Sequence, residues 1–202
     1  MWPWEHLAVG YLCYSLFARV RYGRAPRAVP VVALAVGTQF PDLVDKPLAW
    51  TFGVLPSGHS LAHSALVAVP LALLAVTLGR RAAARNPTSD FRGAGTAFAV
   101  GYLSHLPGDV FYPVIVGGKP NVGFLLWPLV PAAESPTSVG FLEIVRLLFA
   151  RFVGELFSGA FSTYLALELG LLLCVFALWL ADGVPPFGAL VSRRERRREE
   201  TT

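Results

Sequence analysis

The sequence predicts an all-α fold: a polytopic integral membrane helical bundle of about five spans plus one interfacial helix. Two observations predict this class. Of the 202 residues, 54% are hydrophobic and only 15% are charged, which is too apolar for an ordinary soluble domain. The apolar residues also gather in long stretches that arginine clusters separate. We therefore expect one membrane-embedded domain over residues 1–191 and a charged cytoplasmic tail over residues 192–202.

Three arginine clusters predict the orientation of this bundle. They are Arg19, Arg21, Arg24 and Arg27; Arg80, Arg81, Arg85 and Arg92; and Arg193, Arg194, Arg196, Arg197 and Arg198. Such runs can bind nucleic acid, but beside apolar stretches they more often mark the cytoplasmic side and contact anionic lipid. We expect a multi-pass protein of the cell membrane, in contact with lipid and not with nucleic acid. Its N-terminus would lie outside and its C-terminus in the cytoplasm.

The first two apolar segments lie on either side of the first arginine cluster. Residues 4–20 form a segment whose aromatic start is typical of a membrane interface. Residues 28–40 form a short one, about two thirds of a ~30 Å hydrocarbon core at ~1.5 Å per residue. Pro41 disfavours helical geometry at Phe40, so we predict that this helix ends there.

The middle of the chain alternates loops and spans. Residues 46–58 are punctuated by proline and glycine and predict a loop. A full-length span follows over residues 61–78, with Ser60 as its expected N-cap. Residues 94–116 predict the next span, and residues 117–138 are irregular and rich in proline.

The last third predicts two helices of different kinds. Residues 141–157 are apolar but carry Glu143, Arg146, Arg151 and Glu155. This pattern is typical of an amphipathic helix that lies in the membrane interface. Residues 161–180 predict the last span, with Glu168 in its middle.

All four histidines fall in short polar motifs that border or interrupt apolar segments. The motifs are Glu5-His6, Pro41-Asp42-Leu43-Val44-Asp45, His59-Ser60-Leu61-Ala62-His63-Ser64 and Ser104-His105-Leu106-Pro107-Gly108-Asp109. His and Asp are the ligand types of zinc and similar divalent metals. With the arginines on the cytoplasmic side, all four motifs lie in the outer leaflet. The sequence therefore predicts one site built from all of them.

Two motifs share a four-residue spacing, His59 with His63 and His105 with Asp109. On a helix this spacing puts both side chains on one face, about 6 Å apart. Together with the remaining His and Asp residues, these pairs exceed the three or four ligands that one zinc needs. The surplus indicates either carboxylates that orient imidazoles or two metal ions about 4 Å apart.

A metal in this site predicts hydrolytic chemistry. A divalent metal lowers the pKa of a bound water to ~7 and polarises a phosphoryl or carbonyl oxygen. Asp45 or Asp42 could take the proton of that water. A lone membrane histidine usually only packs, and for His6 this interpretation stays open. Ionisable groups inside membrane segments are costly and usually functional, which favours a site for the others.

The order of the motifs resembles the YdjM-like family of membrane-bound metal-dependent hydrolases. The shared pattern covers roughly residues 1–116 and ends in a Ser-His-x-x-x-Asp span. The family is distantly similar to zinc-dependent phospholipase C and nuclease enzymes, which cleave phosphate esters. Family members often carry arginine where this chain has Ser60. The resemblance implies that Asp45 either binds the metal or contacts a residue that does. It also implies metal ligands at His6, Asp42, His59, His63, His105 and Asp109.

Three functions are open from the sequence. The first is a metal-dependent hydrolase, with one or two divalent ions such as zinc, acting on a phosphate ester or lipid-linked substrate at the extracytoplasmic face. The second is a non-catalytic membrane protein whose metal only joins helices. The third is a transporter, which would need a polar path to the inner face, where the spans carry almost no ionisable groups.

Overall fold

The computed structural model describes residues 1–86, 91–132, 141–157 and 162–188. These residues form six α-helices and one short 3-10 helix, with no strand among them. The elements are α1 (Pro3–Tyr22), α2 (Ala28–Trp50), α3 (Ala65–Arg85), α4 (Ala94–Ile115), η1 (Gly123–Leu126), α5 (Phe141–Phe157) and α6 (Thr163–Ala181). The predicted helical bundle is confirmed. The tail predicted over residues 192–202 lies outside the described residues.

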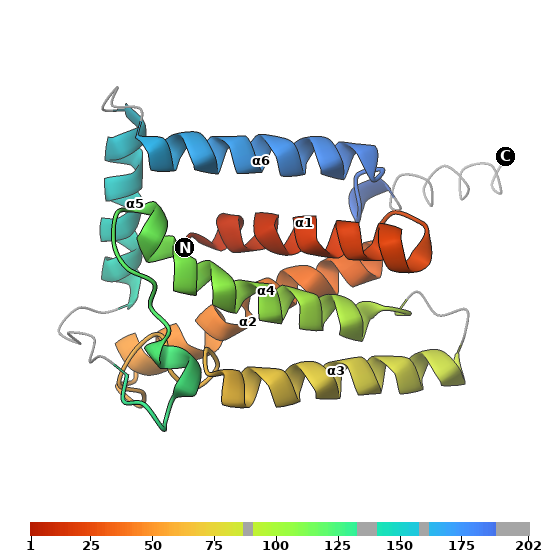
Figure 1. Cartoon of the computed structure of the whole chain (residues 1–202), viewed down its shortest axis with the longest axis horizontal. Helices are drawn as coiled ribbons and strands as arrows, with labels where there is room; N and C mark the ends of the chain where they lie inside the picture. Colours follow the sequence, from red (N-terminus) through yellow and green to blue (C-terminus); the bar gives the residue numbers. More distant parts are fainter. Residues whose placement is uncertain (87–90, 133–140, 158–161, 189–202) are drawn as a thin grey trace, which may run out of the picture.

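Five α-helices run alongside one another, and α5 lies across one end of them (Figure 1). Helix α4 packs against α1, α2 and α3. Helices α2 and α4 touch through their backbones, because a Cβ added at Gly37 would collide with the Phe98 carbonyl. A Cβ added at Gly101 would likewise collide with the Leu34 carbonyl. These glycines permit the close approach that small residues give membrane helices.

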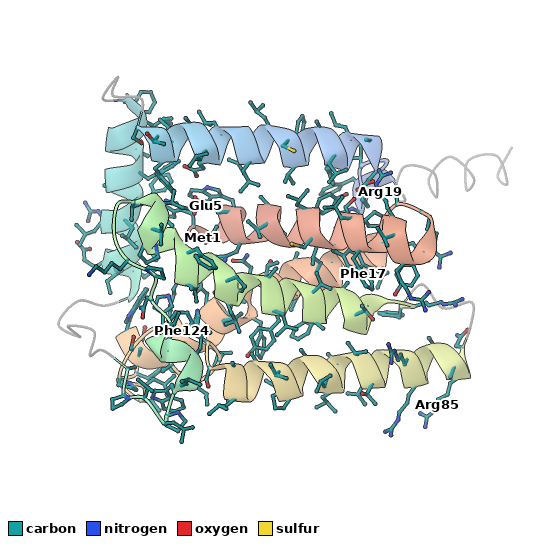
Figure 2. The ribbon with its side chains drawn as sticks, in the orientation of Figure 1. Met1, Glu5, Phe17, Arg19, Arg85 and Phe124 are labelled. Carbon is teal, nitrogen blue, oxygen red and sulfur yellow. The ribbon has the colours of Figure 1, made fainter. Side chains whose placement is uncertain are left out.

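Three helices, α2, α3 and α6, are long and apolar enough to cross a membrane. Large apolar side chains are exposed on them, among them Leu73 and Leu74 on α3 and Leu173 and Phe176 on α6. An exposed apolar surface of this extent fits lipid better than water. Figure 2 shows Arg19 and Arg85 at the end of the bundle opposite Met1, Glu5 and Phe124.

The prediction that the second helix ends at Phe40 is wrong. Helix α2 continues through Pro41 and Pro47 to Trp50 and has 23 residues. At ~1.5 Å per residue this length is about 34 Å, which is enough to span a bilayer core. Proline removes one backbone N–H, and in a membrane bundle neighbouring groups can take up the freed carbonyls. The segment predicted as a loop from residue 46 is therefore helical up to Trp50.

The predicted start of the third helix, with Ser60 as N-cap, is also wrong. Ser64 is the N-cap of α3, and its side chain accepts a hydrogen bond from the backbone N–H of Leu66 at 3.2 Å. His59 and His63 consequently lie in the loop before α3 and not on one helical face. The predicted helices over residues 94–116, 141–157 and 161–180 agree with α4, α5 and α6 to within two residues.

Candidate metal centre

The four polar motifs meet at the end of the bundle that α5 covers (Figure 1). Each comes from a different part of the chain, and the helix directions bring them to the same end. They are His6 at the start of α1, Asp42 and Asp45 in the second half of α2, His59 and His63 in the loop before α3, and His105 and Asp109 in the second half of α4.

Four of these side chains form a compact buried group: Asp42, His63, His105 and Asp109. One ligand atom from each lies within 4.8 Å of all the others. Nε2 of His63 is 3.1 Å from Nε2 of His105, 3.4 Å from Oδ1 of Asp42 and 3.3 Å from Oδ2 of Asp109. Neighbouring ligands of a tetrahedral zinc, each ~2.0–2.1 Å from the ion, are about 3.3–3.4 Å apart. The group therefore fits one tetrahedral divalent metal in both donor type and spacing.

One oxygen of each carboxylate in this group also lacks a hydrogen-bond donor among the described residues. Among the described residues, Oδ1 of Asp42 and Oδ2 of Asp109 are buried and accept no hydrogen bond. Leaving a buried charged oxygen without a donor is costly unless a cation faces it. This observation is a second, independent sign that the group is built for a metal ion.

Asp45 fixes the loop that carries His63. Its carboxylate accepts hydrogen bonds from the backbone N–H groups of Ser60 at 2.8 Å, Ala62 at 2.8 Å and His63 at 3.2 Å. It also lies 2.8 Å from Nδ1 of the His63 ring. Carboxylates that bond the far nitrogen of a ligating imidazole orient the ring and raise its basicity. Asp45 thus turns Nε2 of His63 toward the other three side chains.

A backbone carbonyl plays the same part for His105. Nδ1 of His105 lies 2.7 Å from the carbonyl oxygen of Thr38. Because a carbonyl can only accept, Nδ1 carries the proton and Nε2 keeps its lone pair. That nitrogen is 3.0 Å from Oδ2 of Asp109 and 3.7 Å from Oδ1 of Asp42.

The other two histidines contact Asp109 from either side. Nε2 of His6 lies 3.3 Å from Oδ1 of Asp109, and the His6 ring stacks on His105 with 3.6 Å between the ring centroids. Nε2 of His59 lies 3.5 Å from Oδ2 of Asp109. The amino group of Met1 is 3.2 Å from Oδ1 of the same carboxylate. His6 and His59 thus flank the group of four, where they could serve the same ion or a neighbouring one.

Burial lowers the pKa of both loop histidines, whereas nearby carboxylates raise it. Burial lowers the pKa of His59, so its imidazole is held neutral. Burial also disfavours the charged form of His63, but the carboxylates of Asp109, Asp42 and Asp45 outweigh it and raise its pKa to about 10. In the metal-free protein His63 therefore holds a proton that a metal ion must displace.

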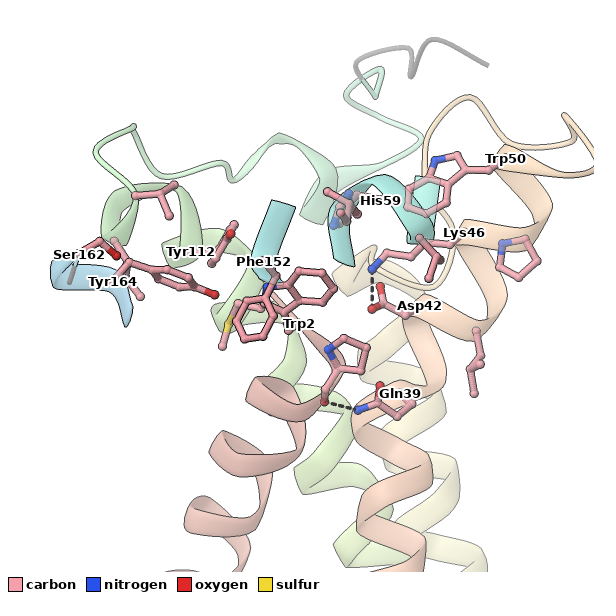
Figure 3. A pocket seen from close by; sticks show the side chains of 18 of the residues that line it. Trp2, Gln39, Asp42, Lys46, Trp50, His59, Tyr112, Phe152, Ser162 and Tyr164 are labelled. Atoms are coloured by element: carbon pink, nitrogen blue, oxygen red, sulfur yellow. Dashed lines mark hydrogen bonds and ion pairs between the residues drawn. The ribbon is translucent and has the colours of Figure 1, made fainter. Parts of the chain in front are cut away.

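A cavity of about 800 Å³ opens onto the group (Figure 3). Asp42 of the group of four and the flanking His59 reach it. Lys46, one helical turn beyond Asp42, also lines it and lies 2.6 Å from Oδ2 of that residue. Most of the remaining wall is apolar and comes from α1, α2, α4 and α5.

Two further buried acids, Glu5 and Glu168, bind aromatic residues instead. Tyr164 donates a hydrogen bond to Glu5 at 2.7 Å, and the indole N–H of Trp4 donates to Glu168 at 2.6 Å. Both contacts join α1 to the start of α6. Glu168, which the sequence placed in the middle of the last span, lies in the first third of α6, bonds to the first helix and is not part of the metal group.

Sequence reasoning missed the supporting residues Lys46 and Thr38. Lys46 follows Asp42 by four residues, which is the spacing of a helical ion pair. The pair would have been apparent had the helix been extended past Pro41. The carbonyl of Thr38 carries no sequence signal, because any residue at that position offers one.

The fold and this site together define a helical membrane protein with a buried His and Asp group able to hold a divalent metal. Comparison with protein families then identifies the family. The model of the YdjM inner membrane protein family matches residues 1–184, so the chain belongs to that family. No curated protein and no solved structure shows significant similarity to the chain.

Proposed function

We propose that this chain is a membrane-bound metal-dependent hydrolase that acts on a phosphate-ester or lipid-linked substrate. One observation carries the proposal: a cavity of about 800 Å³ reaches the metal group through Asp42, and the flanking His59 also lines it. Structural metal sites are closed by protein ligands, whereas catalytic ones keep a position open to substrate and water. Zinc is the metal that a tetrahedral His and Asp group favours.

We also propose that the site faces the outside of the cell membrane in a multi-pass protein. The arginines Arg19 and Arg85 lie at the opposite end of the bundle from the site (Figure 2). Arginine-rich loops stay on the cytoplasmic side. This orientation gives an external N-terminus, a cytoplasmic C-terminus and a site at the level of the outer leaflet.

Some residues of the site would bind the metal, and others would orient the metal ligands or transfer protons. His63, His105 and Asp109 would hold the metal, and Asp42 would stand at the position that faces the cavity. The metal would supply Lewis-acid polarisation of the ester and a water of lowered pKa. Asp45 keeps the His63 ring in position, and the Thr38 carbonyl does the same for His105.

Proton transfer falls to the groups that face the cavity. Asp42 and His59 line it, so either can accept a proton from water beside the substrate. Asp45 is fully buried and its oxygens already accept four N–H groups, which makes it a positioning residue. Of the two carboxylates that the sequence suggested as bases, Asp42 is therefore the one we favour.

A purely structural metal is the second candidate, because the group of four joins α2, α4 and the loop before α3. Under this alternative, metal removal lowers thermal stability and no ester is cleaved. A transport function has less support. Between the site and the arginine end, the described core is apolar around Leu34, Val31 and Ala97.

Metal analysis of the detergent-purified protein tests the proposal first. We expect about one or two ions of metal per chain, and none in His63→Ala or His105→Ala. Ser104→Ala is the matched control, since the Ser104 hydroxyl donates to the Gly101 carbonyl of its own helix and to no other described residue. The same four proteins are then assayed on a panel of phosphate and carboxylate esters. Full activity in either histidine variant, or metal-loaded wild type that cleaves no member of the panel, would contradict the hydrolase.

A further inference from the structure

We propose that the cavity beside the metal group binds a phosphate-headed lipid, with Lys46 on the phosphate and α5 against the hydrocarbon chain. This inference rests on the proposed function, for which it specifies the substrate class. It is carried by the size of the cavity, the position of one lysine and the orientation of one helix.

The cavity has the size and the wall of a site for an apolar ligand. Its volume of about 800 Å³ lies within the ~300–1,000 Å³ of ordinary ligand pockets. Ile115 of α4, Val116 directly after it, and Val145, Leu148 and Phe152 of α5 line it. A water-soluble phosphate ester would leave this apolar surface without a partner, whereas a hydrocarbon chain would cover it.

Charge is concentrated on one side of the cavity. Figure 3 shows Lys46 pointing to Asp42, with His59 and Trp50 close by. Among the described residues that line the cavity, Lys46 is the one lysine or arginine. Its ammonium lies 2.6 Å from Oδ2 of Asp42 and 5.8 Å from the centre of the Trp50 ring.

The ammonium of Lys46 has capacity for a second anion. A lysine carries three N–H donors, and Asp42 accepts from one direction. A divalent metal would balance the charges of Asp42 and Asp109, while Asp45 is held by four N–H groups behind His63. The positive charge of Lys46 then remains to attract the ligand. Lysine is a common point-charge binder of phosphate.

Helix α5 indicates that the phosphate comes from a lipid. It lies across the ends of the other helices (Figure 1), which is the orientation of an amphipathic helix in the membrane interface. Phe152 anchors it to the start of α1, with ring centroids 5.3 Å from both Trp2 and Trp4. The cavity beneath α5 therefore lies at headgroup depth, where a lipid can place its phosphate beside Lys46 and its chain along Leu148 and Phe152.

Photo-crosslinking of the full-length, metal-loaded protein in detergent tests the proposal. The probe is a lysophosphatidic acid of sixteen carbons with a diazirine on its chain, and mass spectrometry maps the labelled residues. We expect labels on α5 and at the end of α4. Unlabelled lysophosphatidic acid should compete, while a monoacylglycerol of equal chain length, the free fatty acid and inorganic phosphate should compete at least about tenfold less well.

Two sets of variants test where the phosphate and the hydrocarbon chain of the lipid bind. Lys46→Gln should reduce labelling about tenfold or more, since it removes a charged hydrogen bond, and Lys46→Arg should retain it. Lys119→Gln is the control, because Lys119 is exposed and does not line the cavity. Leu148→Gln should weaken labelling, and Leu147→Gln on the same helix should not, since Leu147 does not line the cavity. Unchanged thermal stability and metal content show that each variant is folded.

The outcomes separate this proposal from the hydrolase. Labels spread over the outer faces of α3 and α6, or labelling that ignores Lys46, would overturn the lipid site. Equal competition by inorganic phosphate would assign the cavity to soluble phosphates and also overturn it. Because labelling needs no turnover, a protein that binds the probe through Lys46 but cleaves no ester would contradict the hydrolase and leave the lipid site intact.

Discussion

The two ends of the bundle each bury a carboxylate, and they treat it in opposite ways. At the arginine end, Asp182 accepts hydrogen bonds from Tyr11 at 2.8 Å and Ser15 at 2.7 Å and pairs with Arg19. At the other end, Oδ2 of Asp109 accepts no hydrogen bond from the described residues and instead faces three histidines. The first acid has every partner it needs, and the second has a space for a cation.

This contrast separates a structural network from a candidate site. A satisfied buried network adds stability and holds elements together, here α1 and the turn after α6. A buried carboxylate with an unsatisfied oxygen is a cost to the folded protein unless something binds there. The cavity lies at the unsatisfied end, where α5 also lies. The same residue type therefore has two roles that its surroundings determine.

Replacing the buried aspartate by asparagine at each end of the bundle is the strongest test of this contrast. The largest effect is expected at Asp109. Asp109→Asn keeps the size of the side chain but removes the charge that faces the histidines. We expect metal affinity to fall by more than the ~10–100-fold typical of losing an outer partner of a ligand, and turnover to fall with it. Metal content by mass spectrometry and ester hydrolysis measure the effect. Metal retained at wild-type level would remove Asp109 from the ligand set.

Asp182→Asn should have the converse effect. It leaves Tyr11, Ser15 and Arg19 without their charged partner, and breaking a buried pair typically costs about 3 kcal/mol. We expect a lower melting temperature with metal content unchanged. Thermal unfolding in detergent, with metal analysis of the same sample, measures both quantities. Loss of metal in this variant would mean that the two ends are coupled and that Asp182 is not purely structural.

Asp45→Asn should distinguish a residue that positions a metal ligand from a ligand such as Asp109. The amide keeps one accepting oxygen for the backbone N–H groups of the loop, replaces the other with a donor, and loses the charge beside Nδ1 of His63. We expect metal affinity to fall about 10–100-fold and not to vanish, since the ligands themselves remain. Chelator competition measures the affinity. A loss as complete as that of Asp109→Asn would show that Asp45 is itself a ligand.

The sequence predicted those parts of the fold that depend on local composition. Helices α4, α5 and α6 are bounded by changes from apolar to polar residues, and their positions were predicted to within two residues. Helix α2 was cut short because Pro41 breaks helices in isolation. In the bundle, neighbouring helices take up backbone groups of that region, as His105 does with the Thr38 carbonyl.

The candidate site was predictable in its members and not in its geometry. Residue type and motif order brought the His and Asp residues into one hypothesis, because charged groups in membrane segments are rare. The start of α3 was misplaced because Ser60 and Ser64 are equally good caps by sequence. The loop between them is shaped by a carboxylate of another helix, Asp45, and a contact of this kind leaves no local pattern.

Over a single pH unit, competition between protons and metal is the smallest expected effect. In the metal-free protein the carboxylates around His63 raise its pKa to about 10, so the ring is protonated at neutral pH. A metal ion must displace this proton, and its apparent affinity should therefore rise with pH, by up to about tenfold per unit when one proton is released. Titration calorimetry at pH 6, 7 and 8, in buffers of different ionisation enthalpy, measures affinity and proton release together. In Asp45→Asn the same pKa should be lower and the pH dependence weaker. An affinity that does not change between pH 6 and pH 8 would mean that His63 is already neutral, and the carboxylates would then act on the metal alone.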